Sequence, residues 1–124
     1  MDDSTLFFFA KSPQALLLYT ALEKTILQAW PDTKIQIKKT QINFSNRYNF
    51  AFASLPYQRR KGWPVACLLV TFGLPFRIQS ERIVETSQPY LNRWTHHVLI
   101  QRPEDIDDEL MGWISASYHF SATK

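Results

Sequence analysis

Residues 34–45 read KIQIKKTQINFS, and polar and apolar side chains alternate in both halves of this stretch. Alternation with a period of two is typical of strands that have one wet face and one packed face. We therefore predict two strands, Lys34–Lys38 and Gln41–Ser45, with Lys39 and Thr40 between them. The pattern marks the point where the chain changes from helical to strand periodicity.

A helix is predicted immediately before this stretch. From about Pro13 to Trp30, apolar residues recur at every third or fourth position, which places them in one apolar stripe. Ser12 suits the N-cap, and Pro13 suits the first helical position. The helix should end before Pro31, because the residue that precedes a proline disfavours helical geometry.

Further strands are predicted on the C-terminal side, at Tyr48–Leu55, Val65–Phe72, Phe76–Gln79 and Trp94–Ile100. In the first of them, Phe50 and Phe52 are expected on one face and the small alanines on the other. The second is apolar on both faces, which is typical of a central strand that is covered on both sides. The polar stretch Ser80–Asn92 is expected to be an irregular loop, and the most mobile part of the chain.

A second helix is predicted to start near Pro103. Acidic residues crowd its first turns, where the free N–H groups favour negative charge. The expected fold is therefore α+β, in the order α-β-β-β-β-β-β-α. It has a mostly antiparallel sheet of five or six strands, with an N-terminal and a C-terminal helix packed on it. Residues 1–124 are expected to form a single domain.

The composition excludes several classes of protein. With 124 residues, 45% of them hydrophobic, the chain can bury a core. Its acidic start argues against a signal peptide, and the apolar run Leu6–Ala10 is far shorter than the roughly 20 residues that cross a bilayer. A single cysteine, Cys67, excludes a disulfide framework and suits a reducing compartment. We expect a cytoplasmic protein that makes no contact with a membrane.

No familiar catalytic or cofactor motif is present. The three glycines, Gly62, Gly73 and Gly112, are far apart, so neither a Walker loop nor a dinucleotide-binding loop can form. One cysteine and three histidines give no zinc-binding spacing, and no serine lies in a Gly-x-Ser-x-Gly turn. The sequence therefore predicts no cofactor and no metal, and it identifies no catalytic residue.

Charge is unevenly distributed along the chain. Residues 34–102 contain eleven basic and two acidic residues, a net charge of +9, whereas the two flanks contain three basic and nine acidic residues, a net charge of −6. Basic side chains scattered over solvated strands would explain this pattern. The alternative is a positive sheet surface that attracts phosphates or carboxylates.

The last predicted strand carries the first candidate site. Strand alternation places Arg93, Thr95 and His97 on one face, where they could receive a carboxylate or phosphate, and Lys38 could add charge. The alternative is that Arg93 pairs with a helix acid such as Asp107 and binds no ligand. His97 could also act as the general base of an enzyme, although the sequence identifies no partner for it.

A second candidate patch lies in a predicted loop and consists of Tyr57, Arg59, Arg60, Lys61 and Trp63. Its cations could contact nucleic-acid phosphates while an aromatic ring stacks on a base, although three charges alone would bind weakly. A solvated loop is the alternative interpretation. Association of two chains through a sheet edge or an aromatic patch also stays open.

Four segments carry a resemblance to a known family. They are Phe8–Pro13, Lys38–Phe44, Trp94–Val98 and Asp105–Tyr118. Together they resemble a bacterial family, domain of unknown function 5655, over nearly the whole chain, with Ala10 where that family usually has glycine. The resemblance implies a stand-alone or appended bacterial domain with no established activity. It supports the fold, and our best interpretation remains a non-enzymatic module that binds a small anionic ligand or an acidic peptide.

Overall fold

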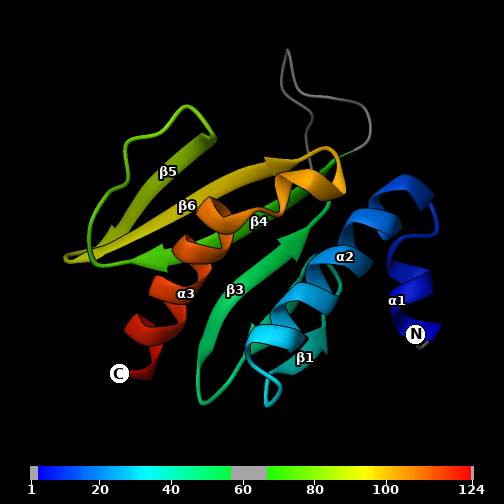
Figure 1. The fold of residues 1–124 in the computed structure, drawn as a ribbon, viewed down its shortest axis with the longest axis horizontal. Helices are drawn as coiled ribbons and strands as arrows, with labels where there is room; N and C mark the ends of the chain where they lie inside the picture. Colours follow the sequence, from blue (N-terminus) through cyan, green and yellow to red (C-terminus); the bar gives the residue numbers. More distant parts are fainter. Residues whose placement is uncertain (1–2, 57–66, 124) are drawn as a thin grey trace.

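The structure is a computed structural model that describes residues 3–56 and 67–123 (Figure 1). Its helices are α1 (Asp3–Phe8), α2 (Pro13–Ala29), the 3-10 helix η1 (Pro103–Asp105) and α3 (Asp108–Ala122). Its strands are β1 (Lys34–Ile37), β2 (Ile42–Ser45), β3 (Asn49–Ser54), β4 (Leu68–Leu74), β5 (Ile83–Tyr90) and β6 (Arg93–Ile100). All neighbouring strands are antiparallel, in the order β1-β2-β3-β4-β6-β5. The predicted α+β fold, with helices before and after an antiparallel sheet, is confirmed.

Helices α2 and α3 lie on the same face of the sheet (Figure 1). Alternate strand residues face them and are fully buried, as Val70 and Phe72 of β4 show. No helix in the described part of the chain covers the opposite face, where Thr71 of β4 and Thr95 and His97 of β6 stay partly exposed. We call this uncovered side the open face. The prediction that β4 is central is confirmed, but the prediction that both of its faces are covered is wrong.

The strand β5 was not expected from the sequence. Residues 80–92 were predicted to be a loop, but Ile83–Tyr90 pairs with β6, and the predicted strand Phe76–Gln79 does not form. Because β5 is an edge strand whose side chains are mostly exposed, it lacks the apolar alternation that identifies buried strands. Pro89 is tolerated there, since an irregularity interrupts the pairing between Ser87 and Tyr90.

The helical boundaries also differ from the prediction at two places. Residues 3–8 form the short helix α1, which the sequence did not indicate. The C-terminal helix begins at Asp108 rather than at Pro103, because residues 103–105 form a separate 3-10 turn. Asp107 is the N-cap of α3, and its side chain accepts a hydrogen bond from the N–H of Leu110. In the described ranges no helix is long and apolar enough to cross a bilayer.

A bulge lies where β2 runs beside the beginning of β3. The pair Ser45–Asn49 is followed by the pair Phe44–Ala51, so Phe50 is an extra residue without a partner on β2. The bulge turns Phe50 towards the helices, where its ring packs on Trp30 and Tyr118. Phe52 pairs with Thr71 on the open face, so the prediction that both phenylalanines share one face is wrong.

Candidate functional site

Arg93 lies on the open face at the start of β6. Its guanidinium lies close against the backbone of Gly73, where a Cβ atom would come within 2.6 Å of Nη2 and 2.7 Å of Cζ. The guanidinium carbon also lies 5.9 Å from the ring centre of Phe120, near the C-terminal end of α3, so the side chain reaches the border between the open face and the helix-covered face. The absence of a side chain at Gly73 therefore creates the position that the guanidinium occupies.

The charge of Arg93 is not neutralised within the described residues. No described carboxylate forms an ion pair with it, and its N–H groups donate to no described acceptor. The alternative in which Asp107 pairs with Arg93 is wrong, because Asp107 pairs with Arg82 instead. Arg93 is thus a positioned cation whose N–H groups find no acceptor among the described residues.

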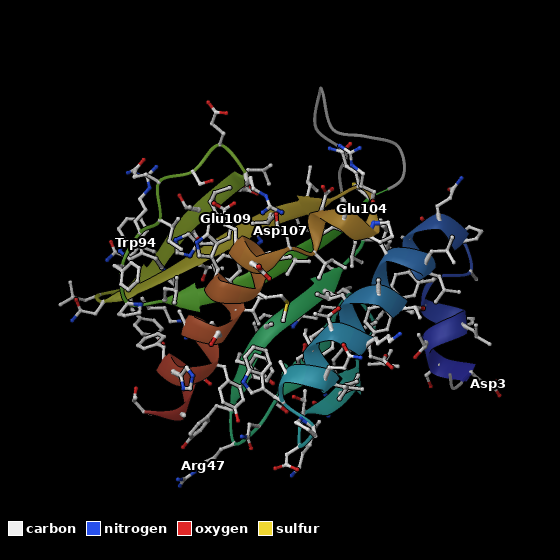
Figure 2. All side chains as sticks on the ribbon, viewed as in Figure 1. Asp3, Arg47, Trp94, Glu104, Asp107 and Glu109 are labelled. Carbon is white, nitrogen blue, oxygen red and sulfur yellow. The ribbon has the colours of Figure 1, made fainter. Side chains whose placement is uncertain are left out.

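Arg82 is the arginine that the acids of α3 neutralise. Its Nη1 donates to Asp107 at 2.9 Å and to Glu109 at 3.0 Å, and Nη2 donates to the backbone oxygen of Asp105 at 2.7 Å. Figure 2 shows Asp107 and Glu109 at the N-terminal end of α3, beside the β5–β6 pair. Burial would lower the pKa of Arg82, but the hydrogen bonds and charges of the two acids outweigh it and raise the pKa. The hydrogen bond from the Leu110 backbone, followed by the bond from Arg82, lowers the pKa of Asp107.

Replacing Arg82 by alanine is expected to lower the free energy of unfolding by about 1–2 kcal/mol, because three acceptors lose a charged donor at a partly exposed site. Arg82→Lys should restore little of this loss, since a point charge cannot reach all three acceptors. Urea unfolding measures both effects. The matched control is Arg102→Ala, which removes one exposed pair with Asp105 at 3.7 Å and should change stability by less than about 0.5 kcal/mol. Equal losses for the two alanine variants would contradict the prediction.

His97 lies on the open face two residues after Thr95. Its Nδ1 lies 2.8 Å from the hydroxyl oxygen of Thr71, and its partner in the β5–β6 register is Glu85. Burial lowers the pKa of His97, and the nearby charge of Glu85 opposes this shift. The ring is therefore mostly neutral at pH 7, and it can orient a ligand through hydrogen bonds without adding charge.

His96 faces the opposite side of β6, as strand alternation predicts. Its ring is fully buried and stacks on Phe72 at 5.2 Å between ring centres, and Nε2 accepts the N–H of Ile78 at 3.0 Å. Burial lowers its pKa, and the positive charge of Arg77 acts in the same direction. The two adjacent histidines therefore cannot bind one metal ion together. Over residues 3–56 and 67–123, no three His, Cys, Asp or Glu side chains are grouped so that they could hold one.

Lys38 does not lie with the other three predicted residues. It follows β1, the first strand in the sheet order, whereas β6 is the fifth. It lines a hollow together with Lys11 and Lys39 instead. One signal in the sequence could have indicated this hollow, since residues of two segments that carry the family resemblance, Phe8–Pro13 and Lys38–Phe44, line it together.

The second predicted patch falls outside the described residues. It comprises Tyr57, Arg59, Arg60, Lys61 and Trp63. Nucleic-acid association through this patch therefore stays a prediction. Titration with DNA at several salt concentrations tests it, because log affinity should fall with log salt by about 0.9 for each phosphate neutralised.

Comparison with known proteins places the chain in a family. No curated protein and no solved structure matches it. The family described as domain of unknown function (DUF5655) matches residues 7–121. This range includes α2, the six strands, α3 except its last residue, and Arg93, Thr95 and His97. Because this match covers nearly the whole chain, the chain belongs to the DUF5655 family of domains of unknown function.

Proposed function

We propose that this domain is a binding module that holds an acidic peptide segment on its open face, with a carboxylate at Arg93. The observation that carries the proposal is that the Arg93 guanidinium packs against Gly73 and has no carboxylate partner in the described part of the chain. An arginine fork binds a carboxylate through two parallel hydrogen bonds. Because the guanidinium is already positioned, little side-chain freedom remains to be lost on binding.

Neighbouring polar groups support the same role. The hydroxyl of Thr95, two residues along β6 from Arg93, makes no side-chain hydrogen bond within the described residues, so it can donate to a bound oxygen. The His97 ring is held by its contact with Thr71 and can contribute a hydrogen bond. Together with Arg93, these groups form a row of donors along one side of β6.

The surroundings favour a peptide over a small free anion. Phe52, Leu69 and Leu99 lie on the open face, and each is partly exposed. Leu69 and Leu99 are direct partners across β4 and β6. A segment that combines acidic with apolar side chains would satisfy Arg93 and also cover this apolar surface, whereas acetate or phosphate would leave it in water.

The test is titration of a labelled peptide in which glutamate and leucine alternate, followed by fluorescence anisotropy. Arg93→Ala should weaken binding by at least about 10-fold, because a two-pronged charged contact is lost. Gly73→Ala keeps the charge but places a Cβ where the guanidinium lies, so it should weaken binding by about 3- to 10-fold. Arg77→Ala is the matched control for net charge, since Arg77 contacts Trp94 and forms no ion pair with a described acid.

Four results would count against the proposal. Equal losses for Arg93→Ala and Arg77→Ala would show that only net charge matters. If a peptide of alternating glutamine and leucine binds as tightly as the glutamate–leucine peptide, the carboxylate does not contribute to binding. If Arg93→Ala unfolds the protein, as circular dichroism would show, the arginine is structural and the proposal fails. If free glutamate binds as tightly as the peptide, the ligand is a small anion and not a peptide.

A second candidate function is catalysis with His97 as a general base. One observation favours it, namely the 2.8 Å contact between His97 Nδ1 and the Thr71 hydroxyl, in which a mostly neutral imidazole could accept the proton. Such an enzyme should hydrolyse an activated ester such as p-nitrophenyl acetate faster than free imidazole does. His97→Gln should remove that activity, and if the variant is as fast as the parent protein, His97 is not the base.

A further inference from the structure

A hollow of about 1000 Å³ lies between α1, the turn from β1 to β2 and the end of β3. Much of its wall is apolar and includes Phe7, Phe8, Ile37 and Leu55. Its size is at the upper end of the range of small-molecule pockets, about 300–1000 Å³. A ligand with a substantial apolar body would therefore fit.

Phe7 shows that part of this wall has no partner inside the described chain. Its side chain is 85% exposed, whereas Phe9, two residues later, is 1% exposed and packs on Tyr19. A large aromatic ring in water gains free energy when another apolar group covers it. Because Phe7 lines the hollow, a ligand bound there could cover the ring.

Three lysines line the same hollow. Lys11 follows α1, and Lys38 and Lys39 lie in the turn from β1 to β2, which the bond from Lys38 N–H to Gln41 O closes at 2.8 Å. Within the described ranges no carboxylate pairs with any of them. Among the lining residues that the structure describes, Asp3 is the one acid, so these residues together have a net charge of +2. The site therefore combines an apolar wall with unneutralised cations.

We propose that this hollow binds a small amphipathic anion, with its carboxylate or phosphate head at Lys38 and Lys39 and its apolar body against Phe7 and Leu55. Lysine binds either head group as a point charge. The proposal is independent of Arg93, because β1 and β6 are separated by three strands in the sheet. Figure 2 shows Asp3, beside the hollow, and Trp94, beside Arg93, on opposite sides of the molecule.

The experiment is isothermal titration of the protein with four probes below their micelle-forming concentrations. Decanoate and decyl phosphate carry both parts of the expected ligand, decanol lacks the charge, and acetate lacks the apolar body. We expect decanoate or decyl phosphate, or both, to bind with one site per chain and at least about 10-fold more tightly than decanol and acetate. Whichever head group binds more tightly identifies the anion. Binding of neither anion, or equal binding of decanol or acetate, would overturn the proposal.

Variants place the binding at the lysines and the ring. The double change Lys38→Ala with Lys39→Ala should weaken binding of the more tightly bound anion by about 5- to 20-fold. The reason is that two positive charges, each partly screened by solvent, are lost. Lys34→Ala is the control for the loss of one positive charge, since this exposed lysine lies at the other end of β1 and outside the hollow. Phe7→Ala should weaken binding by about 5-fold through lost apolar contact. All of these side chains are exposed, so the unliganded variants should melt as the parent protein does.

Three outcomes of the variant experiment would overturn the proposal. One is a loss of affinity in Lys34→Ala as large as the loss in the double lysine variant. Another is an unchanged affinity in Phe7→Ala. Binding that persists in full without Lys38 and Lys39 would place the anion elsewhere. The Arg93→Ala variant should keep its affinity for the amphipathic anion, so failure of one of the two proposed sites does not imply failure of the other.

Discussion

Replacing Ser117 by alanine is expected to lower the free energy of unfolding by about 2–4 kcal/mol, because one hydroxyl satisfies two buried backbone groups. Ser117 Oγ donates to the carbonyl of Phe50 at 2.7 Å and accepts the N–H of Gly73 at 3.2 Å. The residue is 2% exposed, so water cannot easily take over either bond. Each backbone group left without a partner costs about 1–3 kcal/mol.

The position of Ser117 in the sheet explains why one side chain has this role. The β3–β4 register extends from Ser54–Leu69 to Ala51–Phe72, and the next residues, Phe50 and Gly73, are not paired directly. Phe50 lies at the bulge, and the Ser117 side chain from α3 bridges the two backbones. The bond therefore joins α3 to the sheet and continues the ladder across the irregularity.

The control for this prediction is Ser121→Ala on the same helix. Ser121 is also buried, at 4% exposure, but its hydroxyl donates to the carbonyl of Tyr118, three residues earlier in α3. Its removal should cost about 0.5–1 kcal/mol, because one bond of this local type is lost. Urea unfolding followed by far-ultraviolet circular dichroism measures both variants. Similar values for Ser117→Ala and Ser121→Ala would show that the bridge between β3 and β4 has no special weight.

The elements that the sequence predicted well are those whose burial is periodic. The stripe of α2 and the alternation of β1 and β2 follow from residues that are neighbours along the chain, and the structure has them within one residue of the predicted limits. Strand β5 was missed because an exposed edge strand is held by main-chain bonds to β6, which leave no apolar pattern. The bulge at Phe50 was missed because the neighbouring residues have no sequence pattern that indicates an extra residue in the strand.

The candidate site depends on strand order, which local patterns do not determine. Alternation along β6 correctly placed His96 and His97 on opposite faces. The contact between Arg93 and Gly73 could not be predicted, because it forms only when β6 pairs with β4 in the sheet. The same order places β1 and Lys38 far from β6. The charge pattern was also ambiguous, since Arg82 and Arg93 are both arginines near β6 and only Arg82 meets the acids of α3.

Lowering the pH below about 6.5 is expected to destabilise the fold, with His96 as a principal cause. Burial in the core lowers the pKa of His96, and the charges of His97 and Arg77 act in the same direction. The backbones of Phe72 and Trp94 partly oppose this shift. Protonation of Nε2 would also break its bond with the N–H of Ile78.

The sign of the effect follows from proton binding in the two states. In the unfolded chain histidine binds a proton near pH 6.5, whereas folded His96 and His97 bind theirs only at lower pH. Stability is therefore fully present above about pH 6.5 and falls as the pH decreases from there towards the folded-state values. The slope is at most about 1.4 kcal/mol per pH unit for each such histidine. Asp107, whose pKa is also lowered, acts in a separate window below about pH 4.

Urea unfolding at a series of pH values from about 8 to about 5 tests this expectation, because this range extends on both sides of the ordinary histidine pKa. His96→Gln keeps an acceptor for the N–H of Ile78 but cannot be protonated, so its stability should fall less steeply between about pH 6.5 and 5. His97→Gln reports the contribution of the open-face histidine in the same way. The readout is the slope rather than the stability at any one pH, because glutamine also loses the ring contact of His96 with Phe72. An unchanged slope in His96→Gln would contradict the prediction, because it would mean that this imidazole has the same pKa in the folded and unfolded states.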